Sequence, residues 1–159
     1  MGVKFAVAFG AEVTVISTSA SKVKEAHNLG AHHFILASDP TALTPYASSF
    51  DIVLNSISAD HDYTPYQSLL ALHGKLIILG LPEHQPKIST LGLLKNRRSI
   101  IGSMFGGIKE TQEMLDFCHE KNISADVETI PISYINEAYE RMMKGDIKYR
   151  FVIDLSTLS

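Results

Sequence analysis

The chain has 159 residues, and its 14 Lys and Arg against 17 Asp and Glu give a formal net charge of −3. This length suits one domain with a full core, and two full-sized domains would not fit comfortably. The net negative charge argues against non-specific binding to nucleic acid or to an anionic membrane, since both need a basic surface. Charged residues make up only 19%, below the roughly 25% of an average protein, which hints that part of the surface is covered.

The sequence shows no sign of export or of membrane insertion. Its single cysteine, Cys118, permits no intrachain disulfide, which removes the main support for an oxidising compartment. The apolar N-terminus is interrupted by Lys4 and Glu12, and it lacks the cleavage site of a signal peptide. No apolar run approaches the roughly 18 residues that span a bilayer. We therefore expect a cytoplasmic protein with neither a membrane nor a nucleic acid as partner.

Helix-forming and strand-forming segments alternate along the first half of the chain. Residues 1–9 favour a helix that ends at Gly10, and the β-branched segment 12–17 predicts a buried strand. Ser21 is placed to cap a helix over 22–29. The elements expected next are a short apolar run at 33–36, a weak helix over 41–49, a buried strand over 51–54, a helix over 66–72 and a strand over 75–79.

The alternation continues more loosely in the second half. The elements expected there are a short helix over 89–95, a strand over 99–104, an amphipathic helix over 109–121, a strand over 127–132, a helix over 134–144 and a strand over 149–155. Strands that alternate with helices indicate a parallel sheet with helices on both faces. We therefore predict an α/β fold.

Small hydroxyl side chains follow the first predicted strand. In doubly wound sheets ligands bind at the carboxyl ends of strands, and an NAD-binding unit normally has an acidic residue there. Here the strand ends in Ser17, Thr18 and Ser19, and Lys22 lies just beyond. Hydroxyl donors and a cation suit the 2′-phosphate of NADP, which a carboxylate would repel. A serine-rich turn that merely caps a helix accounts for the same residues equally well.

Other motifs give little support to a functional site. No G-x-G-x-x-G turn precedes the segment 12–17, and the glycine cluster at 102–107 has the wrong spacing for a phosphate cradle. Seven histidines invite a metal hypothesis, but His32 and His33 are adjacent on a predicted strand and point to opposite faces. Surface or edge histidines are therefore a better interpretation of these residues than metal ligands. No hydrolase, P-loop or CxxC motif is present.

The order of these segments resembles the C-terminal half of zinc-type, NADP-dependent alcohol dehydrogenases of the medium-chain family, especially the cinnamyl alcohol dehydrogenase-like branch. The stretches that carry the resemblance are MGVKFAVAFGAEVTVIS, STSASK, LGAHHFI, HGKLIILG, GSMFGGIKETQEMLDFC, YINEAYERM and YRFVIDL. They extend over nearly the whole chain. The resemblance implies a Rossmann-like parallel sheet followed by a strand-helix-strand segment. Residues 1–105 would then be an incomplete NADP-binding domain and residues 106–159 a returning segment of the catalytic domain.

The resemblance also implies a set of cofactor-binding residues. By their positions in the family's motifs, the residues for the 2′-phosphate are Ser17, Thr18, Ser19 and Lys22. Ser56, after the strand predicted over 51–54, would contact the cofactor, and Gly80 would lie beside the nicotinamide ribose. The backbone that lines the nicotinamide would come from Ser103, Met104 and Phe105. The family also dimerises through the sheet edge that corresponds to residues 99–103. A homo-oligomer is therefore expected.

The sequence departs from the family pattern where the family places its zinc and its glycine-rich turn. The family's catalytic zinc ligands, its structural zinc lobe and its first Rossmann strand lie in a region that these residues do not contain, so we expect no zinc to bind this chain. In the strand order 3-2-1-4-5-6 that first strand is central. Without it, two neighbouring strands would expose unpaired backbone groups.

The resemblance implies an oxidoreductase that passes hydride between NADPH and an aldehyde. We expect this chain alone to be inactive in that reaction, because the zinc ligands are missing. The alternative is a non-catalytic oligomerisation or interaction module derived from the cofactor domain. A separate N-terminal half, or a swapped copy of the chain, could also fill the central gap.

Overall fold

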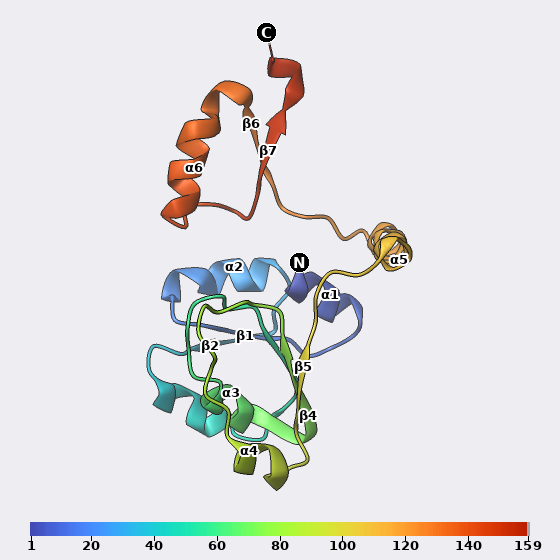
Figure 1. Ribbon diagram of the computed structural model, residues 1–159. Coiled ribbons are helices and arrows are strands. Elements are labelled where there is room, and N and C mark those ends of the chain that lie inside the picture. Colours follow the sequence, from blue (N-terminus) through green and yellow to red (C-terminus); the bar gives the residue numbers. More distant parts are fainter. Residues whose placement is uncertain (159) are drawn as a thin grey trace.

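A computed structural model describes residues 1–158, in which helices and parallel strands alternate (Figure 1). The first sheet consists of β1 (Thr14–Ser17) and β2 (His33–Leu36), which pair in parallel from Thr14 opposite His33 to Ser17 opposite Leu36. Helix α1 (Gly2–Ala8) precedes β1, and α2 (Val23–Asn28) connects the two strands.

The second sheet has three parallel strands in the order β3 (Phe50–Asn55), β4 (Leu70–Ile78) and β5 (Ser99–Gly102). Helix α3 (Thr64–Leu69) connects β3 to β4, and α4 (Thr90–Lys95) connects β4 to β5. These connections are the parallel crossovers that the alternation of elements predicts, and the α/β fold class is confirmed.

Both sheets pack on one apolar cluster. Its buried members are Ile35 of β2, Leu43 of the 3₁₀ helix Pro40–Tyr46, and Leu69 of α3. Ile16 of β1 and Val53 of β3 pack against this cluster. A second cluster lies nearby, formed by the buried residues Tyr63, Leu70 and Leu76. Side-chain packing therefore joins two sheets that share no hydrogen-bonded strand pair among the described residues.

The C-terminal part of the chain forms a separate strand-helix-strand unit, drawn in orange and red in Figure 1. Helix α5 (Ile108–Glu120) leads into β6 (Glu128–Pro131), α6 (Ile135–Met143) and β7 (Phe151–Asp154). Strands β6 and β7 pair in parallel. Within this unit, Arg141 of α6 donates two hydrogen bonds to the carboxylate of Glu128 on β6. Helix α5 contacts the N-terminal part of the chain, where its Phe117 stacks on Phe9 with ring centroids 4.7 Å apart.

Four expectations about these elements are wrong. The helix expected over 66–72 ends early, because α3 ends at Leu69 and β4 begins at Leu70. The strand over 51–54 is not buried on both sides, because Ile52 is 55% exposed and Leu54 is 47% exposed. The residues of β1 are likewise only half-buried. Ser21 caps no helix: it lies inside a 3₁₀ turn, Ala20–Lys22, and α2 begins after it without a side-chain cap.

The strands have open edges, and the alternation of side chains along β3 explains the exposure of Ile52 and Leu54. Within residues 1–158, β1 pairs only with β2 and β3 pairs only with β4, so each strand has one edge without a partner. Alternate residues of a strand point to opposite faces, so Val53 faces the apolar cluster while Ile52 and Leu54 point away from it. No helix described in residues 1–158 has the length and apolar character needed to cross a membrane. The domain boundary at residue 105 stays a prediction.

Candidate functional site

The register of the second sheet brings the ends of its three strands to one edge. Asn55 is opposite Ile78, and Ile78 is opposite Gly102. Because the strands are parallel, the residues that follow them emerge side by side at the carboxyl edge. Ser56 and Ser103 therefore leave the sheet at the same level, and the amide of Ser103 donates to the carbonyl of Ile78 at 3.1 Å.

The turn after β1 gathers three hydroxyl groups. The Ser17 hydroxyl accepts a hydrogen bond from the Ser19 amide at 3.2 Å, and the Ser19 and Ser21 hydroxyl oxygens are 2.8 Å apart. Ser21 belongs to this cluster, although the sequence pattern indicated only a helix cap there. Lys22 ends the 3₁₀ turn, is exposed, and forms no ion pair within residues 1–158. The turn therefore offers hydroxyl donors and an ammonium group to an anion.

Gly80 follows β4, and the loop after β3 passes directly against it. A Cβ added at Gly80 would lie 2.2 Å from the carbonyl oxygen of Ile57 and 2.5 Å from its carbonyl carbon, so only glycine fits. The amides of Leu79 and Gly80 both donate to the carbonyl of Asn55, at 2.8 and 3.1 Å. The close approach of Ile57 is thus one reason for glycine here, whatever its relation to a cofactor.

The loop after β3 is held by a buried amide and a histidine. Asn55 is 4% exposed; its Oδ1 accepts from the amide of Ile57 at 3.1 Å, and its Nδ2 lies 2.9 Å from Nε2 of His61. Nδ1 of His61 lies 2.7 Å from the carbonyl of Ala59. The imidazole also packs on Tyr63, with ring centroids 4.9 Å apart. The sequence pattern grouped His61 with the surface or edge histidines, and its partners become apparent only in the folded loop.

A histidine–carboxylate pair lies on the same loop. Asp60 Oδ2 is 2.5 Å from Nδ1 of His84, and Asp60 Oδ1 accepts from the backbone amide of His84 at 3.0 Å. The hydrogen bonds from the backbone and the side chain of His84 lower the pKa of Asp60 below its ordinary value. Asp60 is therefore an anion at neutral pH and ties the loop after β3 to the loop after β4.

The segment after β5 is open to solvent. Met104 is 84% exposed and Phe105 is 89% exposed, and both precede α5. Such large apolar side chains are costly to leave in water. Their exposure is consistent with the predicted contact to a nicotinamide, which stays a prediction.

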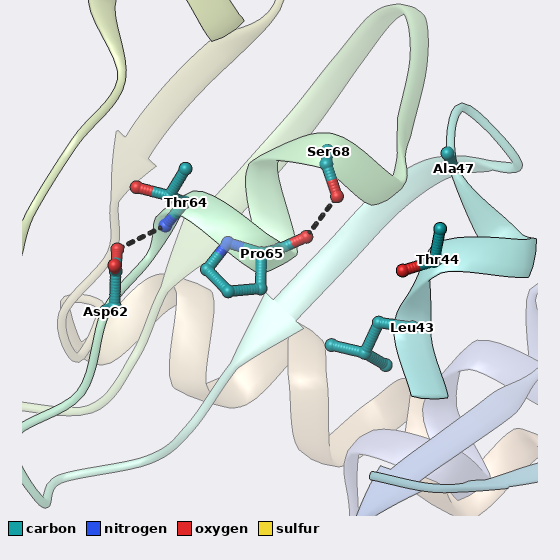
Figure 2. Close-up of a pocket in the computed structure, with 7 residues that line it drawn as sticks. All are labelled: Leu43, Thr44, Ala47, Asp62, Thr64, Pro65 and Ser68. Carbon is teal, nitrogen blue, oxygen red and sulfur yellow. Dashed lines mark hydrogen bonds between the residues drawn. The ribbon is translucent and has the colours of Figure 1, made fainter. Parts of the chain in front are cut away.

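A cavity of about 390 Å³ lies between the 3₁₀ helix Pro40–Tyr46 and α3 (Figure 2). The residues that line it are Leu43, Thr44, Ala47, Asp62, Thr64, Pro65 and Ser68. Figure 2 shows two hydrogen bonds among these residues: Asp62 accepts from the Thr64 amide at 2.8 Å, and the Ser68 hydroxyl donates to the Pro65 carbonyl at 2.6 Å. None of the residues predicted to bind a cofactor lines this cavity.

The described residues do not fit a zinc site. Within residues 1–158, no three His, Cys, Asp or Glu side chains come together in a way that could hold a metal ion. His33, for example, is bonded to Glu12 at 2.7 Å. Zinc needs three or four such ligands around one point.

Comparison with known proteins shows that both the sequence and the fold of this chain are similar to those of one family of dehydrogenases. The family described as zinc-binding dehydrogenase matches residues 1–120. NADP-dependent alcohol dehydrogenase C 1 of Mycolicibacterium smegmatis is 49% identical over 158 residues, which is 99% of this chain and 45% of that protein. The chain thus spans less than half the length of this curated relative.

Two solved structures show the same arrangement. A cinnamyl alcohol dehydrogenase from Sorghum bicolor superimposes with a TM-score of 0.92 at 36% identity, over 98% of this chain and 44% of that one. The cinnamyl alcohol dehydrogenase of Helicobacter pylori, solved as a complex with NADP(H), has a TM-score of 0.83 at 37% identity over the same shares.

Replacing Gly80 by alanine tests the close approach of the two loops. The added methyl group overlaps the Ile57 carbonyl, so Gly80→Ala should lower the free energy of unfolding by roughly 1–3 kcal/mol, the usual cost of overpacking. Urea denaturation measures this change. Gly102→Ala is the matched control, because its Cβ meets nothing within 4 Å and should cost less than about 0.5 kcal/mol. Equal effects of the two substitutions would contradict the assigned contact.

Proposed function

The chain belongs to the zinc-binding dehydrogenase family, and we propose that it forms the cofactor-binding part of an NADP-dependent alcohol dehydrogenase that interconverts an aldehyde and an alcohol. Relatives named as NADP-dependent alcohol dehydrogenase and cinnamyl alcohol dehydrogenase, at 49% and 50% identity, support the proposal. The site after β1 supports the choice of NADP over NAD.

The single observation that carries this choice is the turn of hydroxyl residues and lysine after β1. From Ser17 to Lys24 the sequence has no Asp or Glu. The Ser17 hydroxyl accepts from the Ser19 amide, the Ser19 and Ser21 hydroxyls are hydrogen-bonded, and Lys22 follows directly in the chain. A phosphate dianion needs hydrogen-bond donors and positive charge, whereas a ribose 2′-hydroxyl is normally bound by a carboxylate.

Each part of the carboxyl edge has a distinct task in this proposal. The ammonium group of Lys22 and the hydroxyls of Ser17, Thr18 and Ser19 bind the 2′-phosphate. Ser56 and Gly80 form the edge along which the rest of the dinucleotide lies. Ser103, Met104 and Phe105 supply backbone and apolar surface to the nicotinamide and exclude water there. When bound, NADPH supplies the hydride.

Lysine substitution tests the proposed phosphate contact. Lys22→Ala should weaken NADPH binding roughly 10- to 100-fold, since a hydrogen bond to a charged group contributes roughly 1.5–3 kcal/mol, and should leave NADH binding unchanged. Lys24→Ala removes a neighbouring exposed cation from α2 and serves as the control. Fluorescence titration measures both affinities. If the unsubstituted chain binds neither nucleotide, the non-catalytic interaction module becomes the better assignment.

We also propose that this chain associates with another chain through its open strands. Strand β5 pairs only with β4 in the described residues, and Ile101 on it is 40% exposed. Its free edge can pair with the same strand of a second copy, as the family resemblance suggests for residues 99–103. The open edges of β1 and β3 can accept a strand from an N-terminal half or from a swapped copy.

The mass of the protein in solution tests this association. Light scattering coupled to size-exclusion chromatography should give at least twice the 17.5 kDa of one chain. Ile101→Lys, which puts a charge on the proposed edge, should shift the mass toward one chain. A monomer at every concentration would argue against pairing of any of these edges with a second copy of this chain.

The proposal includes the inactivity of these 159 residues alone. The aldehyde oxygen requires an electrophile, and the described residues fit no zinc site that would supply one. Purified chain mixed with NADPH, zinc and an aromatic aldehyde should therefore show no turnover above the buffer rate, followed by absorbance of NADPH. Turnover at an ordinary enzymatic rate would overturn this part of the proposal and leave the binding assignment standing.

A further inference from the structure

We propose that His61 is a positioning residue: as a neutral imidazole with its proton on Nδ1, it holds the loop between β3 and α3 in the shape that the cofactor edge requires, and protonation releases that loop. The effect on nucleotide binding rests on the proposed function. The state of the imidazole itself does not, because it follows from the hydrogen bonds of this chain.

The partners of His61 determine where its proton lies. A backbone carbonyl can only accept, so Nδ1, which is 2.7 Å from the carbonyl of Ala59, must donate. Asn55 uses its Oδ1 to accept from the Ile57 amide, which turns its NH₂ group toward Nε2 of His61. Since that NH₂ group can only donate, Nε2 must accept. One neutral tautomer satisfies all three contacts.

A protonated imidazole does not fit this arrangement. With protons on both nitrogens, the Nε2–H group would face the NH₂ group of Asn55 across 2.9 Å. Rotating the amide by half a turn would relieve that contact, but it would then turn the NH₂ group toward the Ile57 amide, another donor. Asn55 is only 4% exposed, so water cannot readily replace the lost partner, and an unpaired buried polar group is costly.

The charged surroundings do not remove this conflict. The groups that face or flank the imidazole are Tyr63, Tyr66, Asp60 and Asp62. The two carboxylates attract a proton to His61, but Asp60 is bonded to His84 and Asp62 accepts from the Thr64 amide, with Lys87 also acting on Asp62. Neither carboxylate is bonded to Nε2 of His61. After protonation, the Nε2–H group and the NH₂ group of Asn55, both donors, would therefore still face each other.

The network reaches the candidate site through the backbone. The carbonyl of Asn55 accepts from the amides of Leu79 and Gly80, and Ile57 lies against the Cα of Gly80. Moving Asn55 or Ile57 therefore changes the surface at Gly80, where the nicotinamide ribose is expected. Protonation of His61 puts a second donor at Nε2, so acidification is the condition that releases the loop.

The tautomer can be read directly by ¹⁵N NMR of the 159-residue chain without nucleotide. At pH 8 the ¹⁵N chemical shifts of the two ring nitrogens of His61 should show a proton on Nδ1 and none on Nε2. The signals of His61 are assigned by their absence in the variant His61→Gln. The Ile57 amide should exchange with solvent faster at pH 5.5 than the intrinsic pH dependence of exchange allows. A proton on Nε2 at pH 8 would overturn the proposal.

A binding measurement tests the consequence for the cofactor. NADP⁺ affinity of the unsubstituted chain should fall at least threefold more between pH 7.5 and 5.5 than that of His61→Gln, whose neutral amide accepts from Asn55 at both values. The comparison cancels the titration of the 2′-phosphate itself, which occurs near pH 6. His119→Gln removes an exposed histidine of α5, outside the hydrogen bonds of this loop, and should keep the wild-type profile.

The outcomes separate this proposal from the proposed function. Parallel pH profiles for the unsubstituted chain and His61→Gln would refute the positioning role while NADP binding stands. If no variant binds NADP⁺, the proposed function fails, and the NMR tautomer and the exchange of the Ile57 amide still decide the state of His61.

Discussion

The backbone ladder of the second sheet is the constraint on which the site depends. Hydrogen bonds fix Asn55 opposite Ile78 and Ile78 opposite Gly102, so three chain segments turn out of the sheet at one level. The loop at Ile57, the glycine at position 80 and the segment after β5 come together only because of this register. A shift of one residue in a strand would turn its side chains to the opposite face and separate these groups.

The first sheet depends on a weaker kind of interaction. Its link to the second sheet is the apolar cluster that Ile16, Ile35 and Val53 share, with no strand pairing between the sheets in the described residues. Apolar packing is non-directional, so it holds the sheets together without fixing the angle between them as a ladder does. No strand pairing in the described residues therefore links the turn at Ser17 to Lys22 with the carboxyl edge that carries Ser56, Gly80 and Ser103.

The sequence pattern predicted most element types, because apolar periodicity and glycine reflect local preferences. Gly10 and Gly30 adopt positive φ values of 78° and 102° after α1 and α2, as expected for residues that end helices. Burial was predicted poorly. The apolar segment 51–54 indicated a buried strand, but Ile52 and Leu54 are exposed, because the burial of a strand depends on which layers cover its two faces. The His61 network was also missed, since its partners Asn55 and Ala59 become significant only when the loop folds back on itself. The group of hydroxyl residues at Ser17 could be recognised because its members are adjacent in sequence, and its binding of a phosphate stays a prediction.

Because β1 and β3 have open edges, the free energy of unfolding of this chain would depend on whether another segment is bound at those edges. A segment that binds such an edge in the folded state, and has no affinity for the unfolded state, adds RT ln(1 + [L]/Kd) to the free energy of unfolding. A partner strand present at a hundred times its dissociation constant would contribute about 2.7 kcal/mol, a sizeable fraction of the roughly 5–15 kcal/mol that separates folded from unfolded domains. If a partner binds these edges, the melting temperature of this chain would depend on the concentration of that partner as well as on the packing of its core.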